Sequence, residues 1–411
     1  MSGVSRRELL FGTGGAIAGL AATAGGMAAT GAFGGPDAYG RTPTSARSGT
    51  DTREPSSDGV EATGPTQAGI ARPATPQRFG LLAVLDLPDG PAELGPRLAA
   101  LGAAILAVTN GAGPDGAGPD GARPLPDGPG DLTVTVGLGP RLVAGIDPGL
   151  PGATELPTFA GDGAMDPRRQ GGDLLLALHG SDPLALPTAL RELRAALGDA
   201  ALRWSEPCFR GPGEGTVVRN PLGFHDGIVV PHGDDELARE VWLPTADDGG
   251  DPRVAGGTVC VVRRLVLDTE RFAGLGPESQ DAVMGRRRSD GAPLSGGTLS
   301  DDVDLHAKTP AGEYLVPARS HARAAHPSFT GSGLMLRRGY TFATPAVGDD
   351  PGETGLLFVC FQRELDTFVR TQHRLDETDS LTDFVTPTAS ATFLVLPGFD
   401  ESRPLGSTLS G

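Results

Sequence analysis

The chain has 411 residues, in which 51 acidic side chains outnumber 34 basic ones and give a net charge of −17. Nucleic acids and anionic membrane surfaces attract proteins with a basic face, so this charge argues against both as partners and favours small-molecule chemistry. The length allows two domains of ordinary size, each with its own core.

The first segment, residues 1–32, contains a pair of arginines, Arg6 and Arg7, ahead of an apolar stretch rich in glycine and alanine. This stretch is too weakly hydrophobic for a stable membrane anchor and is typical of a twin-arginine export signal. We therefore expect the twin-arginine translocation machinery to export the folded chain to the extracellular, periplasmic or cell-wall side of the membrane.

Three further segments have compositions that predict little fixed structure. Residues 33–75 contain few large apolar side chains and many Gly, Pro, Ser and Thr, which predicts a disordered linker. The tandem AGPDG within residues 112–130 predicts an exposed loop. Residues 401–411 are predicted to form a flexible C-terminal tail.

After the linker, the apolar residues alternate between strand and helix periods as far as residue 210. Six segments in the order β-α-β-β-α-β are predicted over residues 79–87, 93–108, 131–139, 171–180, 182–197 and 201–209. This is the order of a ferredoxin-like domain, which we assign to residues 76–210.

The same order returns in residues 211–400. The six segments of this second half are predicted over residues 258–268, 270–285, 334–342, 355–363, 368–385 and 391–398. The predicted fold is therefore α+β, with two tandem ferredoxin-like halves whose antiparallel sheets carry helices on their outer side.

The candidate functional residues lie in the second half. Asp226 stands between two glycines in RNPLGFHDG, where a turn that needs glycine holds the carboxylate. Residues 321–342, HARAAHPSFTGSGLMLRRGYTF, concentrate histidine and arginine in an otherwise acidic chain. Because successive residues of a strand face opposite sides, only one of Arg337 and Arg338 is expected to enter a pocket, and the other to be solvated.

A bound haem in the C-terminal half accounts for this concentration of cationic and imidazole groups. A neutral imidazole nitrogen ligates haem iron, an arginine two residues away pairs with a propionate, and a second arginine projects over the other haem face. Structural zinc is a poorer interpretation, because no pair of Cys or His residues has the usual zinc spacing. A hydrolase is poorer too, because there is no GxSxG turn.

Several segments together resemble the dye-decolourising haem peroxidases, in particular their exported branch. The resemblance covers about residues 65–400 and is carried by RN with GFHDG, GGTVCVVRRLVLD, AVMGRRRSDGAPLSGG, HARAAHP, LMLRRGYTF, GLLFVCFQRE and LVLPG. It implies a haem peroxidase that uses hydrogen peroxide to oxidise bulky organic reductants, such as dyes and phenolics, by one-electron steps. It also implies one haem b per chain and two ferredoxin-like halves.

Carried onto matching positions, the resemblance assigns a role to each candidate residue. His321 is the expected iron ligand, and Asp226 and Arg337 are the expected catalytic pair on the distal face of the haem. The expected haem contacts are Arg323, at a propionate, and Gly227, Leu356 and Phe358.

Some alternatives stay open. His326 stands where the family commonly has asparagine and is a second candidate ligand, although the spacing to Arg323 favours His321. The carboxylate expected beside the ligand ring is Asp376, Asp379 or Asp383. An extracytoplasmic haem or iron handling protein on the same fold is the alternative function. A cargo protein that docks through its C-terminal tail is less favoured, because an export signal argues against an intracellular shell.

Overall fold

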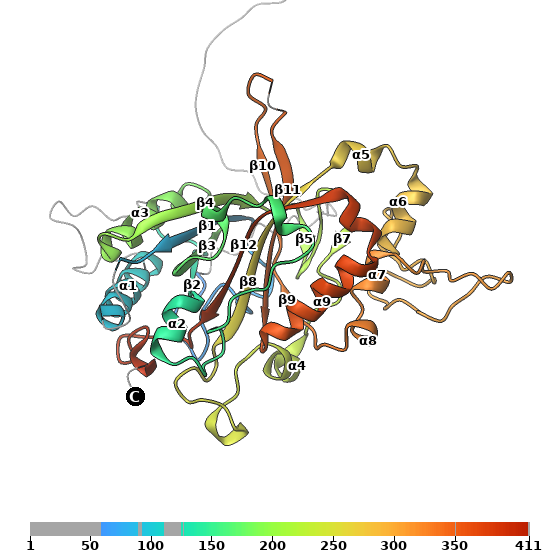
Figure 1. Ribbon diagram of the computed structural model, residues 1–411. Coiled ribbons are helices and arrows are strands. Elements are labelled where there is room, and N and C mark those ends of the chain that lie inside the picture. Colours follow the sequence, from blue (N-terminus) through green and yellow to red (C-terminus); the bar gives the residue numbers. More distant parts are fainter. Residues whose placement is uncertain (1–58, 89–92, 111–124, 126, 350, 410–411) are drawn as a thin grey trace, which may run out of the picture. The chain divides into compact units, whose positions relative to one another are not determined.

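The structure, a computed structural model, describes residues 59–88, 93–110, 125, 127–349 and 351–409 (Figure 1). The predicted export signal of residues 1–32 lies outside these ranges, as do the first part of the predicted linker and most of the predicted loop at 112–130. Within the described ranges, no helix combines the length and the apolar character needed to cross a membrane.

The first half has the predicted ferredoxin-like order. Its elements are β1 (Phe79–Asp86), α1 (Leu94–Thr109), β2 (Thr133–Leu138), α2 (Pro140–Ile146), β3 (Leu174–Gly180), α3 (Ala185–Leu197) and β4 (Ala201–Phe209). The strands pair antiparallel in the order β4-β1-β3-β2. The short helix α2 is an addition that the sequence pattern did not predict.

The second half repeats this order. Its elements are β8 (Thr258–Leu267), α5 (Thr269–Ala273), α6 (Pro277–Met284), α7 (His321–Ala324), α8 (Pro327–Thr330), β9 (Leu336–Arg337), β10 (Tyr340–Thr344), β11 (Glu353–Gln362), α9 (Leu365–Thr378) and β12 (Val385–Val395). The predicted single helix over residues 270–285 is wrong. It is divided into α5 and α6 because Pro277 starts a new helix after Gly276.

A small hairpin sheet connects the halves and carries one candidate catalytic residue. It consists of β5 (Gly213–Glu214), β6 (Val217–Arg219) and β7 (His225–Asp226), and α4 (Gly233–Glu240) follows it. Asp226 therefore lies at the end of a short strand, paired with Val218 of β6.

The strands of the two halves form one sheet that closes on itself. Its order is β10-β4-β1-β3-β2-β12-β8-β11-β9, and β10 also pairs with β11. Strand β2 of the first half pairs with β12 of the second, and β10 of the second pairs with β4 of the first. Each half thus covers both edge strands of the other.

This closed sheet explains the fully apolar strands. Every residue of β3 is buried. Its Leu174, Leu176 and Leu178 pack with the outer helices α1 and α3. Leu175 and Ala177 face a second core, which lies inside the ring that the closed sheet forms. A strand buried on both faces reads as a continuous apolar run, which is the pattern LLLAL.

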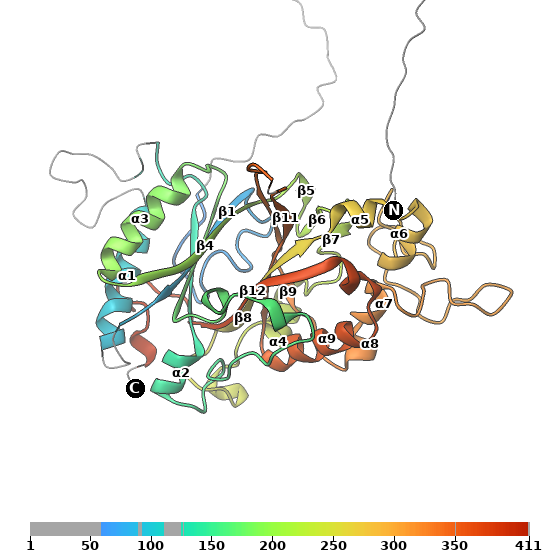
Figure 2. The same cartoon turned by 45° about the horizontal axis from the view of Figure 1, so that its top comes forward.

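The helices cover the outer faces of the two halves differently. In the first half α1 and α3 pack side by side on the sheet (Figures 1 and 2). In the second half α9 packs on β8 and β11, while α5 and α6 contact α7 and the 3₁₀ turn η5 (Ser380–Phe384). A large cavity lies on this outer face of the second sheet.

The prediction of a disordered linker is wrong for residues 59–75. The side chain of Gln67 is buried where β2 meets β12, donates to the Val136 and Leu396 carbonyls at 3.0 Å each, and accepts from the Val136 amide at 2.7 Å. Ile70 belongs to the core inside the ring. Hydrogen bonding of the polar side chain at this junction, rather than apolar burial alone, orders the segment.

The predicted flexible tail also differs from the structure. Leu405 is buried against the outer core, close to Gly102 of α1, and the turn η6 (Ser407–Leu409) follows it. The Thr408 hydroxyl donates to the Arg253 carbonyl at 2.7 Å. One apolar anchor and this bond fix the segment, although its composition is that of a loop.

Candidate functional site

A cavity of about 470 Å³ opens on the outer face of the second sheet. Its floor is formed by alternate residues of three strands, which therefore face the same side: Leu265 and Leu267 of β8, Leu356 and Phe358 of β11, and Val385 and Pro387 of β12. Residues of helices α7, α8 and α9 line other parts of its wall. Of the predicted site residues, His321, Asp226, Gly227, Arg337, Leu356 and Phe358 line this cavity.

His321 begins α7 and faces the cavity with one ring nitrogen committed. Its Nδ1 lies 2.7 Å from Oδ2 of Asp379, whose side chain is 2% exposed. Burial would lower the pKa of His321, but the Asp379 carboxylate outweighs this effect and the pKa lies above its usual value. Because the carboxylate holds Nδ1, the other nitrogen, Nε2, is left for a metal ion.

The structure identifies Asp379 as the carboxylate partner among the three candidates. Asp379 follows α9, and its Oδ1 accepts the Leu381 amide at 2.9 Å, which fixes the carboxyl group. Asp376 instead accepts from the Ala160 amide and from Gln372. The η5 turn after α9, which the sequence pattern predicted as continuous helix, is what brings Asp379 to His321.

His326 also lines the cavity but has both ring nitrogens engaged. Its Nδ1 accepts the Ser328 amide at 3.1 Å, and its Nε2 lies 3.1 Å from Oδ2 of Asp302. Because Nδ1 accepts the hydrogen bond from the Ser328 amide, the ring proton is on Nε2, which donates to Asp302. His326 therefore has no free nitrogen for iron in this arrangement, whereas His321 does.

Asp226 presents one hydrogen-bonded and one unbonded carboxylate oxygen. Oδ1 accepts the Gly227 amide at 2.6 Å and Arg337 Nη2 at 3.3 Å, while Oδ2 has no hydrogen-bond partner among the described residues. Burial would raise the pKa of Asp226, but the positive charge of Arg337 and the Gly227 amide outweigh it and hold the pKa below its usual value. Oδ2 is thus the carboxylate oxygen that is free to accept a proton.

Arg337 and Arg338 face opposite sides of the sheet, as strand geometry predicts. Arg337 lines the cavity, and its Nη1 donates to the Val229 carbonyl at 2.8 Å. The expectation that the other arginine is solvated is wrong. Arg338 points into the ring, is 2% exposed and donates to the Ile70 and Pro73 carbonyls, because the ordered segment before β1 covers it.

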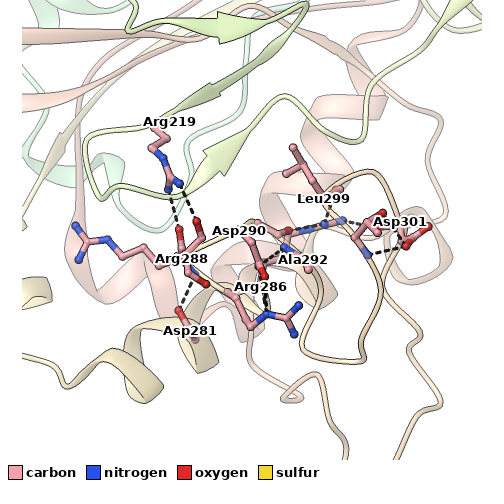
Figure 3. Close-up of polar contacts among 12 residues, drawn as sticks. Arg219, Asp281, Arg286, Arg288, Asp290, Ala292, Leu299 and Asp301 are labelled. Carbon is pink, nitrogen blue, oxygen red and sulfur yellow. Dashed lines mark hydrogen bonds and ion pairs between the residues drawn. The ribbon is translucent and has the colours of Figure 1, made fainter.

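A network of arginines and carbonyls fixes the hairpin that carries Asp226 (Figure 3). Arg219 of β6 donates to the carbonyls of Gly223, Arg288 and Ser289 at 2.6–3.0 Å. The hairpin is therefore tied to the loop after α6. Gly223 has a φ of 84°, a left-handed backbone conformation that favours glycine in this turn.

The predicted propionate contact at Arg323 has no support in the structure. Arg323 is not among the residues that line the cavity; it donates to the Val316 and Leu305 carbonyls at 3.1 and 2.6 Å, and its guanidinium lies over the Tyr314 ring at 4.3 Å. Successive residues of a helix are turned by about 100°, so a residue two positions after His321 points away from the side that His321 faces.

Sequence reasoning missed two arginines that do line the cavity. Arg263 of β8 is 1% exposed, forms an ion pair with Asp162 and has a buried Nε without a partner among the described residues. Arg286, after α6, donates to the carbonyls of Gly291, Leu299 and Asp301 (Figure 3). It forms no ion pair among the described residues that would neutralise its positive charge. Both lie in segments that carry the family resemblance, VVRRLVL and GRRRSDG.

The residues of this cavity fit a haem. Its volume lies within the range of cofactor sites, its walls are mainly apolar, and His321 offers a nitrogen whose partner already fixes the ring. Arg286 supplies positive charge for the carboxylates that haem carries, whereas the charge of Arg263 is already paired with Asp162. The same cavity holds Asp226 and Arg337, so an acid–base group and a cation lie beside the metal site.

Comparison with known proteins agrees with this reading. The family model "Dyp-type peroxidase, C-terminal" matches residues 218–400. A dye-decolorizing peroxidase of Thermobifida fusca is 36% identical over 293 residues, 68% of each chain. A deferrochelatase of Escherichia coli K12 is 31% identical over 296 residues, which cover 68% of this chain and 69% of that protein.

The fold agrees as well. The crystal structure of a DyP-type peroxidase from Streptomyces coelicolor superposes with a TM-score of 0.77 at 32% identity, over 86% of this chain and 98% of that one. The relatives match both halves and not the haem-binding half alone, since the overlap exceeds the 218–400 region. The chain belongs to the Dyp-type peroxidase family and is a haem-dependent peroxidase.

Proposed function

We propose that the chain binds one haem b through His321 and uses hydrogen peroxide to oxidise bulky organic donors such as dyes and phenolics. The observation that carries this proposal is the joint placement of His321–Asp379 and Asp226–Arg337 in one cavity. Bound haem would supply an iron centre that reduces peroxide and then takes electrons from the donors one at a time.

The residues of the chain control the protons and charges of this reaction. Asp226 Oδ2 accepts a proton from peroxide and returns it to the departing oxygen, while Arg337 stabilises the negative charge on that oxygen. Asp379 orients the His321 ring and raises its basicity. Arg286 replaces Arg323 as the proposed haem carboxylate contact, because no ion pair among the described residues neutralises it.

Haem or iron handling is the second candidate function, and the relatives named deferrochelatase favour it. Removal of iron from haem needs protons delivered to the porphyrin nitrogens, whereas peroxide cleavage needs a base and a cation together. The lowered pKa keeps Asp226 ionised, so its carboxylate can accept the peroxide proton but carries no proton of its own to deliver to a porphyrin nitrogen. The distal pair therefore favours the peroxidase.

An assay of the haem-loaded wild-type protein separates the two functions. With peroxide and an anthraquinone dye, we expect loss of dye colour over many turnovers and an intact haem absorption spectrum afterwards. A deferrochelatase would instead convert haem to metal-free protoporphyrin, which fluoresces. Accumulation of protoporphyrin without dye turnover would contradict the peroxidase proposal and support iron handling.

For export, the proposal rests on the sequence of residues 1–32 alone, which lies outside the described residues. We propose that the twin-arginine translocation machinery recognises Arg6 and Arg7 and carries the haem-loaded chain across the membrane. Replacing both arginines with lysine keeps the charge and is expected to leave folded, haem-loaded protein in the cytoplasm. Immunoblots of cell fractions measure this, and normal export of the double variant would refute the assignment.

A further inference from the structure

Arg210 brings the first half of the chain to the catalytic hairpin. It directly follows β4, its amide donates to the Arg78 carbonyl at 2.8 Å, and its side chain is 6% exposed. The guanidinium lies over the Tyr340 ring, 5.6 Å from the centroid, and its Nη2 donates to the Thr216 carbonyl at 2.8 Å. A buried cation thus lies between the ring of strands and the small sheet that carries Asp226.

From Thr216 the contacts continue to Asp226. The Thr216 hydroxyl donates to the Gly227 carbonyl at 2.8 Å, and the Gly227 amide donates to Asp226 Oδ1 at 2.6 Å. Gly227 has a φ of 80°, and a Cβ there would lie 2.2 Å from the Thr216 carbonyl oxygen. The backbone beside Asp226 is therefore held tightly by a chain of contacts that starts at Arg210.

A second, much smaller cavity of about 10 Å³ lies behind Asp226. Both Asp226 and Arg210 line it, together with Val218, Arg219, Asn220, Gly339, Tyr340, Thr341 and Leu356. The Nη1 atom of Arg210 is buried and has no hydrogen-bond partner among the described residues. This volume is about that needed for one water molecule, and an unpaired buried donor beside a carboxylate is the setting in which such water binds.

We propose that the small cavity binds one ordered water that accepts a hydrogen bond from Arg210 Nη1 and donates one to the Asp226 carboxylate. Arg210 is then a positioning residue that acts on Asp226 through this water and through Thr216. The proposal rests on the proposed role of Asp226 as the proton acceptor for peroxide. The charged and titratable groups around Asp226 are Arg337, His321 and His225 on the large cavity and Arg210, Arg219 and Tyr340 on the small one.

The Arg210→Met variant tests the proposal through its pH profile. Loss of a cation and of a donated hydrogen bond favours the protonated carboxyl group, so we expect the acid limb of the peroxide rate constant to move upward by about 0.5–1 pH unit. A purely structural defect would lower the rate at every pH without moving this limb. Arg78→Met is the matched control, because it removes the same charge from an exposed neighbour of Arg210 and is expected to change neither quantity.

Three further experiments keep the test decisive if Arg210→Met folds poorly. Arg210→Lys retains the charge, so its acid limb is expected to lie between those of the wild type and Arg210→Met. Thr216→Val removes only the hydroxyl bond to Gly227, so it is expected to lower the rate while the acid limb stays in place. A high-resolution crystal structure of the haem-loaded wild type should show a water within hydrogen-bond distance of both Arg210 and Asp226.

Either of two results overturns the inference. One is clear density for this region without such a water, and the other is an unshifted acid limb in both Arg210 variants. Asp226→Asn separates this failure from failure of the proposed function. If that variant reacts with peroxide as fast as the wild type, the role of Asp226 is wrong; if it is slow while the Arg210 variants are unshifted, only the inference about Arg210 is wrong.

Discussion

The His321→Ala protein is expected to bind haem more than about 100-fold more weakly than the wild type, because it loses the cavity-lining imidazole that Asp379 orients and whose Nε2 is left for iron. Titration of the haem-free protein with haem, followed by the Soret band at matched protein concentration, measures this affinity. Asp379→Asn keeps the ligand but loses the carboxylate that orients it. Its affinity is expected to fall by about 10–100-fold.

Three control variants separate ligation from general damage to the fold. His326→Ala is expected to keep its haem affinity, because both nitrogens of His326 already have partners. Arg286→Leu should weaken haem binding with little change in the melting temperature of the haem-free protein, whereas Arg323→Leu should lower that melting temperature. An unchanged haem affinity and ferric spectrum in His321→Ala would rule out His321 as the ligand.

Removal of the distal base is the second large effect. Asp226→Asn keeps the shape of the side chain but cannot accept a proton, so the rate constant for peroxide is expected to fall by about 10²–10⁴-fold. Arg337→Leu removes the charge that stabilises the departing oxygen, and a loss of about 10²–10³-fold is expected. Stopped-flow mixing of haem-loaded protein with peroxide measures both rate constants.

The pH at which the rate constant falls distinguishes the roles of Asp226 and Arg337. Since Arg337 holds the pKa of Asp226 below its usual value, the wild-type rate constant should stay level through mildly acidic pH and fall only below about 3.9, the pKa of a free aspartic acid. Arg337→Leu removes the main group that lowers this pKa, so its acid limb should lie at higher pH. Because Arg337 contacts Asp226 directly, this shift should exceed that of Arg210→Met. Wild-type rates in both distal variants would favour haem handling instead.

Residues placed by strand alternation or by a rigid motif could be predicted from the sequence. Leu356 and Phe358 alternate along β11 and both reach the cavity, and the glycines around Asp226 fix its turn. The ferredoxin-like order was confirmed because most of the predicted segments have an apolar run or period of their own, as in the continuous run of β3 and the apolar face of α3.

Residues whose position depends on loops could not be predicted. Three aspartates near the end of α9 are equivalent by sequence, and only the break at Asp379 selects one. Arg286 reaches the cavity because three carbonyls of a loop hold it, and a loop has no period to read. The contact assigned to Arg323 came from the family resemblance and from the spacing to His321, and neither takes account of the rotation of a helix between His321 and Arg323.

Because the strands of the two halves close into one sheet, neither half is expected to be stable without the other. A half separated from the other would expose two unpaired strand edges, β2 and β4 in one case and β10 and β12 in the other, and such edges recruit other chains. The haem-binding half would also lose Arg210 and the Asp162 partner of Arg263. Evolution by exchange of one half alone is therefore costly, and a proteolytic cut between the halves should leave the fragments associated rather than release a working peroxidase domain.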